Sequence, residues 1–184
     1  AFVKGLGDEF ADAEDFKKKV EESIRRQEEK RIERELKQRI LQTISAGVDF
    51  ELPEVMVEAE IAEALERVKQ NLSSRGTTLE DAGLSEEKMR NEFREPARKR
   101  VKDTLILAKI AEKEKLTVVE EDVRKGFEDL AAATGQQADS LRKYYEARNL
   151  LGTFKENLLE EKTLNYLVEN ANIKELDKRE LDKT

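Results

Sequence analysis

The chain has 184 residues, of which 35 are Lys or Arg and 42 are Asp or Glu, so its formal net charge is −7. It contains no His and no Cys, which excludes disulfides, metals ligated by either residue and catalytic pairs built on them. Charged residues make up 42% of the chain, against about 25% in an ordinary globular protein. Leu, Ile, Val and Phe still account for about a quarter of it, which is enough to expect a folded chain.

Apolar residues recur at steps of three and four almost throughout the sequence, and the chain holds only 2 Pro and 8 Gly. This spacing is typical of amphipathic helices. The first helix is predicted over residues 14–45, with Asp12 as its N-cap. A helix of about 30 residues is roughly 45 Å long, and the stretch 25–31 is polar on every side. We expect this middle part either to cross solvent or to bridge two packed regions.

Gly47 ends the first helix, and a second helix is predicted over residues 53–75. Pro53 suits the first helical position, where its missing N–H has no cost, and Gly76 suits the end. One face of this helix carries an apolar row, which consists of Val57, Ile61, Leu65, Val68 and Leu72. A short turn of helix is expected over residues 79–82, before Gly83.

Ser85, followed by two glutamates, predicts the start of a third helix. Pro96 lies inside its apolar pattern, so we expect a kink or a split there, because proline removes a backbone hydrogen bond. The spacing of Thr117 and Glu120 matches a capping box at the start of a fourth helix. Gly135 is expected to end that helix.

Asp139 is placed to cap a short helix, and a final helix is predicted over residues 150–167. The apolar stripes are narrow and the helices long, which favours arms or hairpins over a compact bundle. We therefore predict an all-α fold, a single elongated multi-helix domain over residues 1–184 with protruding helical arms. Residues 1–13 and 175–184 are expected to be flexible ends.

The chemistry-bearing residues give no strong indication of catalysis or metal binding. Carboxylate pairs are frequent, but they lie among Lys and Arg on predicted solvent faces; the pairs are Glu21/Glu22, Glu28/Glu29, Glu86/Glu87, Glu120/Glu121 and Glu160/Glu161. The basic stretch 94–102 contains Glu95 and follows Glu92 in an acidic chain, which argues against direct nucleic-acid binding. We expect no catalytic residue, no metal and no cofactor.

Several segments resemble the C-terminal domain of bacterial trigger factor, a ribosome-associated folding chaperone. Three of these segments read FELPEVMVEAEI at 50–61, REPARKRVK at 94–102, with the resemblance continuing to 111, and LLEEKTLNYL at 158–167. The fourth, at 112–123, is a lysine-rich helix end that leads into the start of the next helix. Asp8-Glu9-Phe10, before the long charged helix, is similar to the family's connection out of its middle domain. The segments follow the family's order and cover nearly the whole chain.

The resemblance implies a helical body whose two arms form a cradle that holds unfolded or nascent polypeptides without ATP. The family's full protein also carries a ribosome-docking domain with a Gly-Phe-Arg signature and a prolyl isomerase domain. Neither is found in this sequence, so we expect no enzyme activity, and ribosome contact only through those missing domains. The resemblance further implies a cytoplasmic bacterial protein with no membrane contact, and it leaves self-association open.

The residues that we expect to bind unfolded polypeptide are apolar residues near the arm tips and the inner wall: Met56, Met89, Phe93, Phe127 and Tyr145. Each of them also suits a position in the core. The alternative function is that of a helical adaptor that binds one folded partner through a groove. An enzyme working on carboxylates ranks last.

Overall fold

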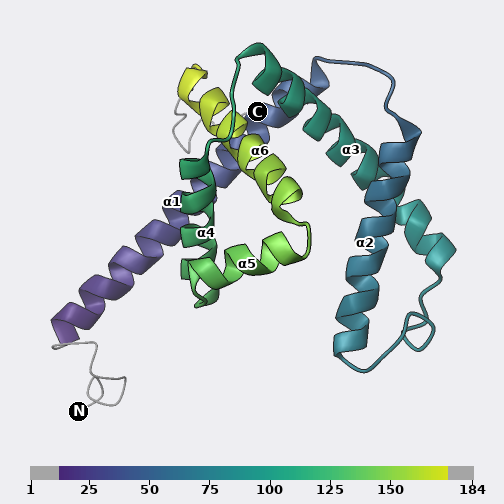
Figure 1. Cartoon of the computed structure of the whole chain (residues 1–184), viewed down its shortest axis with the longest axis horizontal. Helices are drawn as coiled ribbons and strands as arrows, with labels where there is room; N and C mark the ends of the chain where they lie inside the picture. Colours follow the sequence, from purple (N-terminus) through teal and green to yellow (C-terminus); the bar gives the residue numbers. More distant parts are fainter. Residues whose placement is uncertain (1–12, 174–184) are drawn as a thin grey trace, which may run out of the picture.

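The computed structural model describes residues 13–173 and places six α-helices and no strand within that range (Figure 1). The helices are α1 (Ala13–Ala46), α2 (Glu54–Ser74), α3 (Glu86–Lys113), α4 (Glu120–Thr134), α5 (Ala138–Ala147) and α6 (Leu151–Asn170). The predicted all-α fold is confirmed. The Asp12 N-cap lies outside the described residues. The two ends that we expected to be flexible lie outside them as well, apart from residue 13, where α1 begins. None of the described helices is long and apolar enough to cross a membrane.

Helices α2 and α3 pack against each other and form what we call the arm, at the right of Figure 1. The arm core consists of Val57, Ile61, Ala97 and Val101, all of them buried. Of the two alternatives predicted at Pro96, a kink or a split, the split is wrong, because α3 runs unbroken through this residue. Burial of the neighbouring apolar side chains outweighs the single hydrogen bond that proline removes. The segment at 79–82 forms a hydrogen-bonded turn and not a helix.

Helices α4, α5 and the first half of α6 form a second unit, the head. Its core contains Val123, Phe127 and Leu141. The rings of Phe127 and Phe154 stack with centroids 4.2 Å apart, and Tyr145 meets Phe127 edge-on at 5.4 Å. The two cores share no residue, so the arm and the head are separately packed.

The predicted capping box at Thr117 and Glu120 is wrong, because α4 begins only at Glu120. Val118, in the irregular segment before α4, packs against the head core. The Asp122 carboxylate instead accepts a hydrogen bond from the Val119 backbone N–H at 2.9 Å, which satisfies one of the free donors at this helix end.

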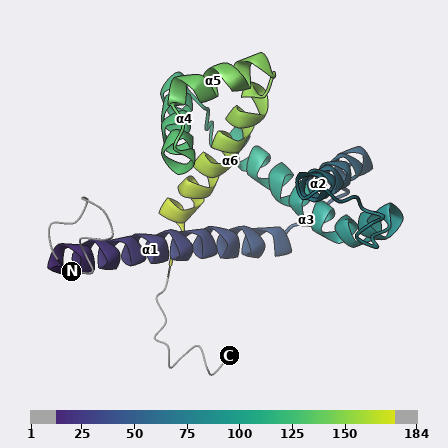
Figure 2. The ribbon, with the colours of Figure 1, turned by 90° about the horizontal axis from the view of Figure 1, so that it is seen from below.

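Helix α6 lies at the centre of the fold and contacts α1, α3, α4 and α5. Helix α1 packs on α6 and α3 only through its C-terminal part, where Lys37 and Ser45 are buried. Residues 17–35 are all exposed, and Figure 2 shows this half of α1 projecting beyond the rest of the molecule. Of the two expectations for the charged middle of α1, the one that it crosses solvent is confirmed.

Candidate functional site: a cavity between the arm and α6

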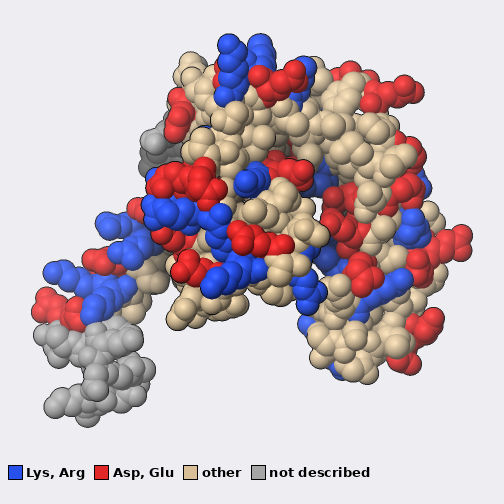
Figure 3. Space-filling view, in the orientation of Figure 1, with Lys and Arg blue, Asp and Glu red and all other residues tan. Residues whose placement is uncertain are grey.

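A cavity of about 680 Å³ lies between α2 and α3 of the arm and the facing side of α6. In the space-filling view the molecule is hollowed between the arm and the head (Figure 3). The apolar residues that line this cavity are Met56, Ala59, Val101, Leu105, Leu107, Ala108 and Leu159. Since the cavity draws residues from three helices, its shape depends on how the arm is set against α6.

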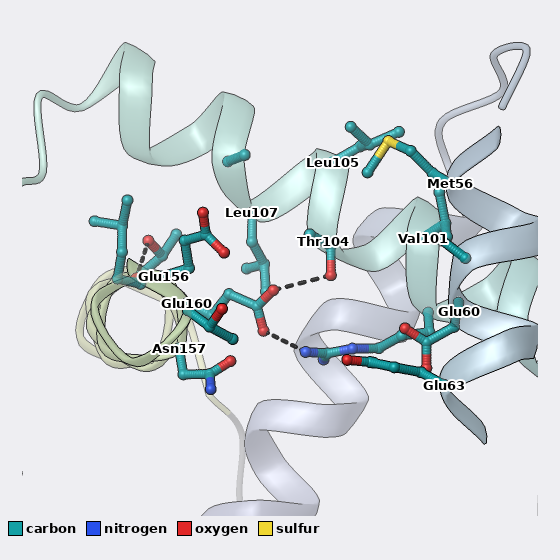
Figure 4. A pocket seen from close by; sticks show the side chains of 16 residues that line it. Met56, Glu60, Glu63, Val101, Thr104, Leu105, Leu107, Glu156, Asn157 and Glu160 are labelled. Carbon is teal, nitrogen blue, oxygen red and sulfur yellow. Dashed lines mark hydrogen bonds and ion pairs between the residues drawn. The ribbon is translucent and has the colours of Figure 1, made fainter. Parts of the chain in front are cut away.

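The apolar wall follows from the way α2 packs on α3. Val57 and Ile61 turn fully into the arm core, and successive helical residues point about 100° apart. Met56 therefore points to the side of the arm, where 37% of its surface stays exposed. In Figure 4 its thioether lies toward Leu105 of α3. A flexible, polarizable methionine can adapt to side chains of different shape.

The margin of the cavity is mostly acidic. Glu60 and Glu63 come from α2, Glu156 and Glu160 from α6, and Arg100 from α3. The Arg100 guanidinium donates to the Glu160 carboxylate at 2.8 Å (Figure 4). The arrangement combines an apolar wall with a net negative rim.

The carboxyl pKa values that are displaced among the described residues are all lowered. Hydrogen bonds from Arg90 and Arg94 lower the pKa of the Glu58 carboxyl, and the other displaced carboxyl pKa values are lowered as well, those of Glu28, Glu86, Glu121 and Asp122. A carboxyl that acts as a general acid near neutral pH needs a raised pKa. Among residues 13–173, no cluster of three or more acidic side chains could hold a metal ion.

A second hollow, of about 520 Å³, lies where the end of α1 and the segment 47–53 meet α3. Its lining is almost wholly apolar and includes Ile44, Val48, Phe50 and Ile110. Val48 and Phe50 are both more than a third exposed. The apolar surface left open by this fold is therefore not confined to the larger cavity.

The structure brings only one of the five predicted binding residues, Met56, to the cavity. Met89 is 8% exposed in the arm, and Phe93 packs against the arm core. Phe127 is 2% exposed in the head core, and Tyr145 packs beside it. In this conformation these four side chains contribute to packing. Their contact with unfolded polypeptide stays a prediction from the sequence, and binding in the cavity does not require it.

Sequence reasoning missed Leu105 and Ala108 of α3 and Leu159 of α6 as cavity residues. A signal for the α3 residues was available in the stretch LILAKIA at 105–111, which is apolar over more than one helix face. Packing against one neighbouring helix needs only a narrow apolar stripe. A wider stripe indicates that the helix has a second apolar neighbour or an open apolar surface.

A family model described as the C-terminus of bacterial trigger factor matches residues 12–169. Trigger factor of Syntrophotalea carbinolica is 32% identical over 186 aligned positions, which cover 98% of this chain and 42% of that protein. Trigger factor of Geotalea daltonii is 33% identical over an alignment that covers 99% of this chain and 42% of that protein. The chain thus spans about two fifths of the length of these relatives.

Among solved structures, domains of trigger factor from Thermotoga maritima superpose with a TM-score of 0.55 at 23% identity. The match covers 75% of this chain and 82% of that chain. At this identity the likeness shows the fold alone, and it agrees with the all-helical arrangement described above. Taken with the family match over most of the sequence, it leads to one conclusion: the chain belongs to the trigger factor family and corresponds to that family's C-terminal region.

Proposed function

We propose that this chain is an ATP-independent chaperone module that binds unfolded or nascent polypeptides in the cavity between the arm and α6. The observation that carries the proposal is the open apolar wall of that cavity, with Met56 exposed on one side and Leu159 facing it from α6. The membership of the chain in the trigger factor family supports the same role.

The mechanism requires no bond-making step. Removing apolar surface from water contributes about 25 cal/mol per Å², so one fully buried Leu or Phe side chain contributes about 1.5–3 kcal/mol. A few such contacts give binding that is weak enough to reverse, and the adaptable Met56 side chain tolerates different sequences. The charged side chains on the rest of the surface keep the unoccupied cradle in solution.

Aggregation of a denatured client, followed by light scattering, tests this proposal. Met56→Glu places a carboxylate against the apolar wall and is expected to abolish most of the suppression by the wild-type chain. Val55→Glu is the matched control, because Val55 is 83% exposed and does not line the cavity. If the two variants suppress aggregation equally well, the cavity is not the binding site.

A binding assay separates the chaperone from the adaptor that binds one folded partner. Reduced and carboxymethylated α-lactalbumin stays unfolded, whereas the native protein has the same sequence in a folded state. We expect the unfolded form to bind and the native form not to bind. An adaptor is expected to ignore both. The proposal further assigns the chain to the cytoplasm, with no catalysis of prolyl isomerisation and no ribosome contact by these residues.

A further inference from the structure

Three consecutive residues of α6 form polar interactions with three different helices. Glu160 meets α3, Glu161 pairs with Lys37 of α1, and the Lys162 ammonium donates to Asp122 at the start of α4 at 2.7 Å. Successive residues of a helix point about 100° apart. The side chains of this one turn of α6 therefore bind neighbours in three different directions. The next residue, Thr163, is fully buried.

Glu160 differs from its two neighbours because it also lines the cavity. Its side chain is only 19% exposed, and its two oxygens accept from two different α3 residues. The Thr104 hydroxyl donates to one at 2.9 Å, and the Arg100 guanidinium donates to the other at 2.8 Å. Dashed lines in Figure 4 mark both interactions.

Arg100 and Thr104 are four residues apart and therefore lie one above the other on the same face of α3. A carboxylate held at both points fixes the angle between α3 and α6 as well as their separation. Helices α3 and α6 also pack directly against each other, and Leu107 and Ala111 of α3 are almost completely buried. Loss of the carboxylate is therefore expected to leave the fold intact and to loosen the angle.

We propose that Glu160 is a positioning residue that sets the arm against α6 and thereby sets the width of the cavity. The part of this inference that concerns polypeptide binding rests on the proposed function; the part that concerns the arm does not. A wider and more variable cavity presents Met56 and Leu159 farther apart, so an apolar segment can contact only one wall at a time.

The experiment measures distances between spin labels on the arm and on the head of the whole chain. The sequence has no Cys, so single cysteines can be placed at the exposed positions Ser73 and Lys143 without removing others. Glu160→Ala is expected to broaden the distance distribution, whereas Glu160→Gln, which keeps acceptors for Thr104 and Arg100, is expected to broaden it less. Thr104→Val, which removes one donor from the opposite side, is expected to broaden it as well.

Glu156→Ala is the matched control, because Glu156 lies one turn earlier on α6, lines the same cavity and makes no ion pair with the described residues. A label pair within the arm, at Ser73 and Lys99, is expected to stay unchanged in all variants. An unchanged distribution in Glu160→Ala, or the same broadening in Glu156→Ala, would overturn the positioning role.

Binding of fluorescent, reduced and carboxymethylated α-lactalbumin supplies a second readout. If Glu160→Ala broadens the distances and weakens binding severalfold, both the positioning role and the cavity as binding site are supported. If it broadens the distances while affinity stays the same, the positioning role is supported and the proposed use of the cavity fails.

Discussion

Gly126 lies where α4 approaches α6 most closely. A Cβ atom at this position would lie 2.8 Å from Leu158 Cδ2 and 3.0 Å from Phe154 Cζ, both in the head. Overpacking of a core in this way costs typically about 1–3 kcal/mol. The close approach of the two helices therefore depends on glycine at this position.

Gly126→Ala is expected to lower the free energy of unfolding relative to Gly152→Ala by about 1–3 kcal/mol. Both substitutions remove a helical glycine, and nothing lies within 4 Å of a Cβ at Gly152, so the pair isolates the clash. Urea unfolding of the two variants measures the difference. Equal stabilities would show that Leu158 and Phe154 can move aside without loss.

Asp122 ties the start of α4 to α6. The hydrogen bond from Lys162 lowers the pKa of its carboxyl, and the backbone N–H of Val119 lowers it further. Because the pKa is lower in the folded than in the unfolded chain, the ionised carboxylate stabilises the fold fully above the unfolded pKa, about 3.9. That contribution is lost as the pH falls through the lower, folded value.

Asp122→Asn is therefore expected to lower the Tm at pH 7, and the gap to the wild type is expected to close below about pH 4. Thermal unfolding followed by circular dichroism across this range provides the measurement. Asp129→Asn, at an exposed position on the same helix, serves as control and is expected to show no gap. A gap of constant size down to acid pH would contradict the assigned role.

At the scale of single helices, the exposed half of α1 is held by its own side chains. Acidic and basic residues pair one turn apart along it, as in Lys19–Asp15, Arg26–Glu22 and Arg31–Glu35. Such pairs support a helix without tertiary contacts, but salt screens them. This half of α1 is therefore expected to be the least protected of the described helices.

Hydrogen exchange of the backbone amides in residues 17–35 is expected to be fast and to accelerate severalfold in 1 M NaCl. The amides of α2 and α3 at the arm core provide the internal control, because apolar burial holds them and salt does not weaken it. If the exchange of both regions responds equally to salt, local ion pairing is not what holds α1.

The arm and the head are expected to respond separately to core substitutions. Phe127→Ala removes the ring that packs against both Tyr145 and Phe154 and is expected to destabilise the head by about 3–5 kcal/mol. Hydrogen exchange should then rise in α4 and α5 while the α2–α3 contact keeps its protection. Ile61→Ala in the arm core is the reciprocal variant, and a global response to either one would contradict two separate units.

Helical spacing predicted the fold better than it predicted the site. Rows such as Val57, Ile61 and Leu65 place an apolar face on each helix, and low Gly and Pro content leaves few other folds. The same spacing cannot distinguish Met56, at the side of a face, from Phe127, at its centre. That difference depends on which helices pack together, which is set by contacts far apart in the sequence.

Whether a helix begins or continues also depended, at two places, on contacts that are distant in the sequence. Val118, in the segment before α4, packs in the head and α4 begins later than expected, so Asp122 takes over the role that Glu120 was expected to play. At Pro96 the helix continues because the neighbouring Ala97 is buried against α2. In both places tertiary packing overrides the local signal.

At the scale of the whole molecule, the arm and the head each bury their own core, and between them they leave an apolar cavity against α6. A compact bundle of the same helices would cover that wall. If the cavity binds unfolded polypeptide, the two methionines of the chain should respond differently to it. Met56 lines the cavity, whereas Met89 is buried elsewhere in the arm.

Selective ¹³C labelling of the methionine methyl groups gives two signals, since the sequence contains 2 Met. Titration with reduced and carboxymethylated α-lactalbumin is expected to shift or broaden the Met56 signal and to leave the Met89 signal in place, while the native protein should change neither. A response at Met89 with none at Met56 would contradict binding in the cavity between the arm and α6.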